Sequence, residues 1–234
     1  MEPIPQATEA QREARDRAVL RACTVLPAAL LLVTAAYATM RYVVFGPWSV
    51  GHIPLYVMNK AFAWTAIVLL ALALGLGPAA RVWPALGRHL WRRRWWGLAG
   101  FALATVHIVV SLAILNYAYY RSMFRQAFEL TPLAEGAMLA GMLAWLALLL
   151  PLAGSLPGVR QAMSVRYWRA LQGFGVLALA LGGVHLAYGV PGWVTPALWY
   201  GGLPPITLWS AGAVVIALAL RLVARLRSGA GPQS

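Results

Sequence analysis

The sequence predicts an all-α membrane protein, a bundle of six transmembrane helices with both termini in the cytoplasm. Three observations predict it: a low content of charge, six long apolar runs, and basic residues confined to alternate loops. Of the 234 residues, 61% are hydrophobic and only 11% are charged, whereas soluble domains carry about 25% charged residues. A chain so poor in charge cannot cover its core with a solvated surface and needs an apolar solvent.

The apolar runs give the number of spans, because a membrane-crossing helix takes about 20 mostly apolar residues. The stretch 170–220 has no acidic or basic residue and is too long for one span. It breaks at Val190-Pro191-Gly192 and again at the glycines and prolines of 201–205, which are turn signals. The expected spans within a domain of residues 22–227 are about 22–45, 57–80, 95–120, 133–155, 168–189 and 205–225. Polar tails, 1–21 and 228–234, flank this domain, and no strands are expected.

The distribution of charge predicts the orientation. There are 19 Lys and Arg residues against 6 Asp and Glu residues. Fifteen of these basic residues fall in the N-terminal tail, in the loops around 81–94 and 160–169, and at the C-terminal end of the last span (221–227), on one side of a six-span protein. Basic loops stay in the cytoplasm, so we expect a multi-pass protein of a bacterial inner membrane. The same pattern explains the net charge by contact with the lipid bilayer, without a nucleic-acid partner. The other side has only Arg41, Lys60, Arg121 and Arg125, which could steer an acidic partner.

Several classes of chemistry are excluded or weakened. The one cysteine, Cys23, allows neither a disulfide nor a cysteine-based metal site within the chain. No polar segment is long enough for a soluble catalytic domain, so any flavin or nicotinamide chemistry must come from a partner. No carboxylate lies in the interior of a span, since Glu129 and Glu135 fall at the outer end of the fourth, and this weighs against a proton-coupled transporter.

Two histidines lie inside predicted spans, His107 in the third and His185 in the fifth. An ionisable residue within a span marks a candidate functional site, since an imidazole in hydrocarbon needs a hydrogen-bond partner or a metal. Each histidine could bond separately to a neighbouring group, or the two could act together. His52 and His89 fall in loops and are expected to be solvated.

The depth of the two histidines favours joint action. His107 is 13 residues beyond Arg94 and His185 is 16 beyond Arg169, which gives depths of about 20 and 24 Å on two parallel helices. Two imidazoles so placed can bind one iron from both faces, and haem iron commonly takes histidine as an axial ligand. Glycines before the histidines, among them Gly100 and Gly182, would let a flat macrocycle approach the backbone, or would serve ordinary helix packing.

At these residues the sequence resembles the ferric-reductase-like transmembrane domain family. The segment Arg92-Arg93-Arg94-Trp95-Trp96-Gly97-Leu98-Ala99-Gly100-Phe101, leading to His107, resembles its third helix. Trp168-Arg169-Ala170-Leu171-Gln172, with His185 thirteen residues after Gln172, resembles its fifth helix. The family includes ferric reductases, NADPH oxidase cores and the haem-binding membrane subunit of a bacterial methionine-sulfoxide reductase system. The resemblance covers roughly residues 55–225.

This resemblance implies b-type haem held by histidines of the third and fifth helices, and electron transfer across the membrane. His107 and His185 match the outer ligand positions. Gln172 stands where the family has its inner histidine, and no histidine lies near Arg93 and Arg94. One bis-histidine haem b is therefore expected, where the family has two.

The expected function is a membrane haem-b electron-transfer subunit, the membrane component of an oxidoreductase. It would pass electrons between a quinol or flavoprotein donor and a periplasmic acceptor, with a redox partner protein and with quinone or a partner-borne flavin as further cofactors. Two alternatives stay open: a structural or assembly membrane protein of the same fold without redox activity, and a small transporter.

Overall fold

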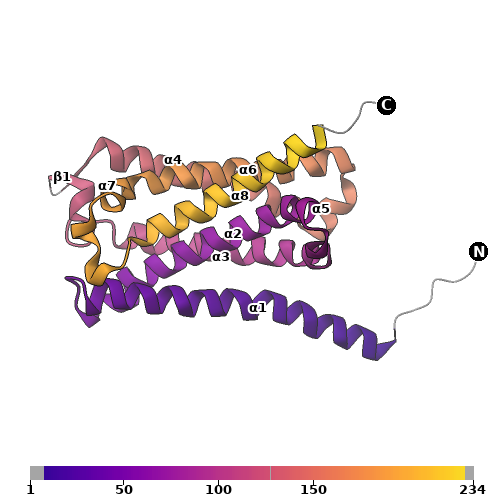
Figure 1. Ribbon diagram of the computed structural model, residues 1–234, viewed down its shortest axis with the longest axis horizontal. Coiled ribbons are helices and arrows are strands. Elements are labelled where there is room, and N and C mark those ends of the chain that lie inside the picture. Colours follow the sequence, from indigo (N-terminus) through magenta and orange to yellow (C-terminus); the bar gives the residue numbers. More distant parts are fainter. Residues whose placement is uncertain (1–7, 127, 230–234) are drawn as a thin grey trace, which may run out of the picture.

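The computed structural model describes residues 8–126 and 128–229, and these form a bundle of long helices (Figure 1). Within this part of the chain, six helical segments are long and apolar enough to cross a membrane, which confirms the six-span prediction. They are Asp16–Val44, Val50–Val82, Pro84–Ala113, Pro132–Ala153, Val165–Trp193 and Tyr200–Arg227.

The α-helices have the bounds α1 Glu9–Thr39, α2 Met58–Val82, α3 Arg93–Ala113, α4 Pro132–Ala153, α5 Pro157–Ala162, α6 Val165–His185, α7 Val190–Trp193 and α8 Ile206–Gly229. The short strands are β1 Phe124–Gln126 and β2 Glu129–Leu130. Short π- and 3₁₀-helical turns extend several helices, for example at Met40–Val44 and Pro84–Arg92.

Helix α2 is the central element, since it packs against α1, α3, α6 and α8, while α4 pairs with α6. Its buried positions are rich in small residues, such as Ala61, Ala66 and Gly75. In lipid no hydrophobic force drives helices together, so close packing of small side chains and interhelical hydrogen bonds hold them. One such bond joins the buried hydroxyls of Thr34 on α1 and Thr65 on α2 at 2.8 Å.

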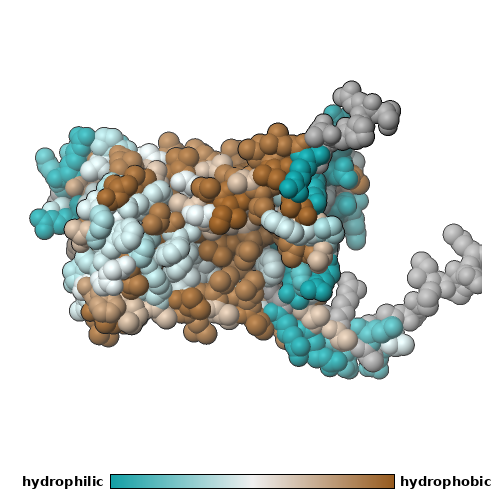
Figure 2. Space-filling model, in the orientation of Figure 1, coloured by the Kyte–Doolittle hydropathy of each residue, from teal (hydrophilic) through white to brown (hydrophobic). Residues whose placement is uncertain are grey.

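The surface carries an apolar band with hydrophilic residues gathered towards its ends (Figure 2). Large aliphatic side chains in mid-span are exposed, among them Leu32, Val33, Leu139, Val215 and Ile216. A monomer that is soluble in water rarely exposes so much contiguous apolar surface. The band is the lipid-facing surface of a multi-pass membrane protein.

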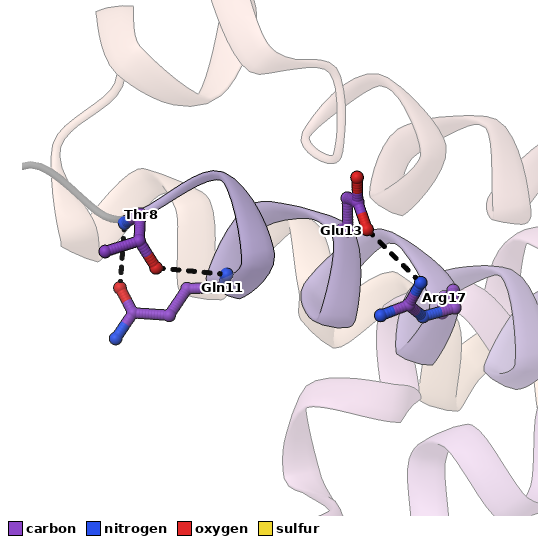
Figure 3. A network of polar contacts seen from close by, with 4 residues as sticks. All are labelled: Thr8, Gln11, Glu13 and Arg17. Atoms are coloured by element: carbon purple, nitrogen blue, oxygen red, sulfur yellow. Dashed lines mark hydrogen bonds and ion pairs between the residues drawn. The ribbon is translucent and has the colours of Figure 1, made fainter.

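The first helix begins earlier than the sequence predicted. Thr8 and Gln11 form a capping box in which each side chain accepts from the other residue's backbone N–H (Figure 3). Glu13 and Arg17 form an ion pair one turn later at 3.4 Å. Residues 9–21 are therefore the first turns of α1, and not a separate polar tail, because the cap satisfies backbone donors that would otherwise be left unpaired. Residues 1–7 and 230–234 of the predicted tails lie outside the described residues.

The third span ends earlier than predicted, at Ala113 and not at Tyr120. The side-chain carbonyl of Asn116 accepts from the backbone N–H groups of Ala118 and Tyr119, and this local bonding competes with helix continuation. The following segment contains the antiparallel pair β1 and β2, so the expectation of no strands was wrong. This pairing depends on a tight reversal that apolar periodicity does not reveal.

Helices α4 and α6 begin with side-chain caps that fix where each span starts. The hydroxyl of Thr131 accepts from the N–H of Ala134, and that of Ser164 accepts from the N–H of Tyr167. Pro132 follows the first cap, at a position where its missing N–H costs nothing. With the helices beginning at these residues, the end of α6 lies beside Ala137 and Gly141 of α4.

The bundle has two chemically different ends. The arginine-rich end comprises residues 81–94 and 154–169, and the tyrosine-rich end comprises residues 42–57, 114–126, 128–131 and 186–205. The described part of α1 begins, and that of α8 ends, at the same end of the bundle (Figure 1).

Candidate functional site

His107 lies in the second half of α3, facing α2. Its Nδ1 is 2.8 Å from the Oδ1 of Asn59 and 3.3 Å from the Oγ of Ser111. Asn59 is fully buried and donates its amide to Ser111 Oγ at 2.9 Å and to the Tyr120 hydroxyl at 3.1 Å. Since both amide hydrogens are used in this way, the amide oxygen is left to accept, and His107 Nδ1 carries the hydrogen.

His185 is the last residue of α6 and points towards α4. Its Nδ1 is 2.7 Å from the backbone carbonyl oxygen of Ala137. A carbonyl oxygen can only accept, so Nδ1 is again the protonated nitrogen. Gly141, one turn further along α4, makes this approach possible: a Cβ there would lie 2.7 Å from His185 Nδ1.

The two imidazoles face one another across a cavity between the helices. Their ring centres are 6.3 Å apart and their planes are inclined by 69°. Metal–imidazole bonds of about 2 Å, on opposite sides of one ion, place ring centres roughly 6 Å apart. The observed separation therefore suits one metal ion between the rings.

The hydrogen bonds also leave the same nitrogen, Nε2, unbonded in both histidines. Across residues 8–126 and 128–229, neither Nε2 makes a hydrogen bond. A neutral imidazole protonated at Nδ1 keeps its lone pair on Nε2. Histidines that bind metals usually donate their other N–H to a carbonyl or carboxylate, as both histidines do here.

The donor set fits haem better than a bare ion. The described residues contain no group of three or more His, Cys, Asp or Glu side chains that could hold a metal, whereas zinc sites take three or four protein ligands. Two histidines suit an iron whose macrocycle supplies the remaining donors. The cavity measures about 240 Å³, just below the roughly 300–1,000 Å³ of small-molecule sites.

A lysine and several tyrosines line the same cavity at the tyrosine-rich end. Lys60 Nζ is 5.1 Å from the ring centre of Tyr56 and 5.0 Å from that of Tyr120. No ion pair joins Lys60 to a carboxylate of the described residues. Tyr120 lies in the loop after α3, and burial raises the pKa of Tyr120 to about 12, so its hydroxyl stays protonated near neutral pH.

These contacts correct the expectation of four surface cations. Arg41 is 3% exposed and donates to the backbone carbonyls of Leu198 and Leu203, while Lys60 faces the cavity. A buried guanidinium needs acceptors for its donors, and these two carbonyls supply them for Nη1 and Nη2. Arg121 and Arg125 are exposed at the surface, where Arg121 donates to the Tyr117 hydroxyl and Arg125 pairs with Glu129.

The two predicted glycines have different positions. Gly182 lines the cavity, and a Cβ there would meet Ile67 Cδ1 at 3.1 Å. Gly100 does not line it; a Cβ there would lie 2.9 Å from Leu70 Cγ and 3.2 Å from the carbonyl oxygen of Ala66. Gly100 therefore permits close packing of α3 on α2.

A second cavity, of about 450 Å³, lies at the arginine-rich end. Gln172 lines it and donates its Nε2 to the carbonyl oxygen of Pro151 at 3.2 Å. The charged and aromatic residues around it are Trp91, Arg93, Arg94, Phe101, Arg160 and Trp168. None of the described residues that line this cavity is a histidine.

The remaining histidines lie away from the pair. His52 Nδ1 bonds to Ser49 Oγ at 2.9 Å, and its ring lies 4.7 Å from that of Trp48. His89 Nε2 accepts from Arg88 Nε at 3.1 Å. Neither residue lines the cavity of His107 and His185.

Sequence reasoning missed three groups that position the histidines: Asn59, Gly141 and the carbonyl of Ala137. Asn59 could have been noticed, since it is a polar residue at the start of an apolar run. The role of Gly141 had no local signal, because it depends on where α6 ends. No protein-family model matches this chain, and no curated protein matches it significantly.

Proposed function

We propose that this chain is a membrane haem-b electron-transfer subunit of ferric-reductase-like type, with one haem held by His107 and His185. One observation carries the proposal. Two imidazoles from different helices lie 6.3 Å apart, and each has its Nδ1 bonded to an acceptor and its Nε2 unbonded within the described chain. Two histidines with separate structural roles would not be expected to have the same nitrogen bonded and their rings this close together.

Haem iron, when bound, takes up and releases one electron. In this proposal His107 and His185 would hold the iron, and Asn59 and the Ala137 carbonyl would keep both rings in the tautomer that can bind it. The apolar cavity wall excludes water, which is one of the means by which a protein tunes the potential of such a centre.

The proposed setting is a bacterial inner membrane with both chain termini in the cytoplasm. The donor would be a quinol or a flavoprotein and the acceptor a periplasmic protein, so the chain would act as the membrane component of an oxidoreductase. The resemblance in helices α3 and α6, together with the segregation of basic residues, supports this setting.

The test is a reduced-minus-oxidised spectrum of the purified protein, with haem quantified per chain. We expect at most one low-spin haem b. His107→Ala and His185→Ala should each abolish the low-spin signal, since one axial position is then open. His52→Ala and His89→Ala are the matched controls and should leave the spectrum unchanged. Equal loss in all four variants would indicate misfolding and refute ligation by this pair.

One observation favours a second candidate, a structural or assembly membrane protein of the same fold. At the arginine-rich end Gln172 bonds to Pro151 and no described lining residue is a histidine, so a continuous two-haem path is missing. The same spectrum separates the candidates, because a protein of this second kind would purify without haem and would not take it up when haem is added.

A further inference from the structure

Lys60 is a cation without an anion. It lies in the first turn of α2, half-buried, and lines the cavity of His107 and His185. Among the described lining residues it is the only Lys or Arg, and no Asp or Glu joins it there. An ammonium group held in such surroundings is costly unless it is paired.

The contacts of Lys60 compensate only in part for the hydrogen bonds that its ammonium group would make to water. Its Nζ lies over the rings of Tyr56 and Tyr120, about equally far from both. Such cation–π contacts are weaker than pairing with an anion. The ammonium has three hydrogens to donate, and no hydrogen bond from Lys60 is found in the described part of the chain. Its donors are therefore available to a ligand.

Neighbouring hydroxyls offer further donors on the same side. The Tyr120 oxygen accepts from Asn59 Nδ2, and the Thr207 oxygen accepts from Trp193 Nε1 at 2.8 Å. Both residues line the cavity. Each hydroxyl also carries one hydrogen that it can donate. The tyrosine-rich side of the cavity thus presents one positive charge and two hydroxyl donors.

We infer that Lys60 binds a carboxylate of the cavity's ligand, so that a haem held there has its propionates directed towards the tyrosine-rich end. This inference rests on the proposed function. It assigns to Lys60 the recognition of the ligand's acidic groups, while the histidines bind the metal. The opposite wall, formed in part by Leu70, Leu148 and Ala178, is apolar and would accept the hydrocarbon edge of the macrocycle.

The experiment compares two ligands that have the same macrocycle and differ in their propionate groups. Protein prepared without haem is titrated in detergent with haem b, which has two free propionates, and with its dimethyl ester, which has none. Low-spin absorbance reports binding, independently of any electron-transfer activity. The wild type should bind the free acid roughly 10- to 100-fold more tightly than the ester, as expected for a charge-assisted hydrogen bond.

Lys60→Met should bind both ligands with nearly the affinity of the wild type for the ester, and with an unchanged low-spin spectrum. Lys60→Arg should keep the preference for the free acid. Arg121→Gln, which removes an exposed cation at the same end of the bundle, should also keep it. If Lys60→Met does not fold, as judged by circular dichroism, Lys60→Gln carries the same expectation.

An undiminished preference for the free acid in folded Lys60→Met or Lys60→Gln would overturn the inference and leave the proposed function intact. Failure of the wild type to give a low-spin spectrum with either ligand would overturn the proposed function, and with it this inference. An equal loss of preference in Arg121→Gln would mean that only the overall charge of this end matters, which also overturns the role of Lys60.

Discussion

Single hydrogen bonds decide which nitrogen of each histidine faces the cavity, and the two histidines use different kinds of acceptor. His107 depends on a side chain, Asn59, which mutation can remove. His185 depends on a main-chain carbonyl, which no substitution removes, so it can be disturbed only through its surroundings. This difference leads to two separate predictions.

Replacing Asn59 by leucine should weaken haem binding by about 10- to 100-fold, the usual effect of losing a hydrogen-bond partner behind a metal-binding histidine. Asn59→Asp keeps an oxygen that accepts from His107 Nδ1 and should retain most of the affinity. Haem titration followed at the low-spin band measures both. Equal weakening in the two variants would show that Asn59 acts through packing and not through the His107 hydrogen bond.

Replacing Gly141 by alanine should displace the His185 ring, because the new Cβ would lie 2.7 Å from Nδ1. We expect loss of the low-spin spectrum while the helical content is kept. Gly136→Ala, on the same helix, is the matched control, since a Cβ there would meet nothing within 4 Å. That variant should bind haem normally, and an unaltered spectrum in Gly141→Ala would contradict the placement of His185.

At the scale of the helices, the site depends on how closely α2 and α3 approach. Asn59 and His107 can bond only if the two backbones stay near one another along their length. Gly100 lies in this contact, with Leu70 Cγ and the Ala66 carbonyl around the position of its missing Cβ. The backbone carbonyl cannot move aside as a side chain could, so the contact is sensitive to volume.

Gly100→Ala should therefore lower the free energy of unfolding by about 1–3 kcal/mol, the usual cost of overpacking a well-filled core. A thermal denaturation series in detergent measures this. Gly173→Ala, where a Cβ would meet nothing within 4 Å, should lower stability little or not at all. Haem content per folded chain should not differ between the two variants. A selective loss of haem in Gly100→Ala at normal stability would instead show that Gly100 contributes to the cofactor site, as the sequence predicted.

At the scale of the whole molecule, two cavities are stacked along the bundle. Leu70 and Leu148 line both of them. Beside them the rings of Phe101 and Trp145 stack at 6.1 Å between centres, with Phe101 on one cavity and Trp145 on the other. A layer of side chains thus separates the histidine pair from the arginine-rich cavity.

Gln172→His should not create a second haem site. The new imidazole would lie at the arginine-rich cavity, but none of the described residues on α3 at that level could ligate the opposite face of a haem. Haem quantification per chain is the measurement, with the wild type as the reference. A second low-spin haem in this single variant would show that a ligand had been overlooked.

Electron exchange should occur mainly at the tyrosine-rich end. By helix rise, His107 is about 20 Å from Arg94 and His185 about 24 Å from Arg169. None of the described residues lining the arginine-rich cavity is a histidine. In oriented vesicles, we expect reduction by quinol or from the periplasmic face. Fast reduction only by a flavin reductase on the cytoplasmic side would refute this direction.

The sequence by itself determined the number of spans and their approximate bounds, and the structure confirmed six. A backbone in lipid must satisfy its hydrogen bonds within each helix, so each span is set by its own apolar run. The errors fell at the ends. The cap at Thr8 makes α1 begin earlier than predicted, and the bonds to Asn116 make the third span end earlier, at Ala113. Such side-chain hydrogen bonds depend on single residues, so a hydropathy pattern does not reveal them.

The sequence also singled out His107 and His185, since any ionisable residue is unusual within an apolar run. Only the tertiary structure brought them to 6.3 Å from one another, supplied Asn59 and Ala137 as acceptors, and placed Lys60 in the same cavity. Each acceptor lies 48 residues from its histidine along the chain. Contacts over such separations depend on which helix faces pack together, and the packing of small side chains on α2 and α4 decides this without a local signal.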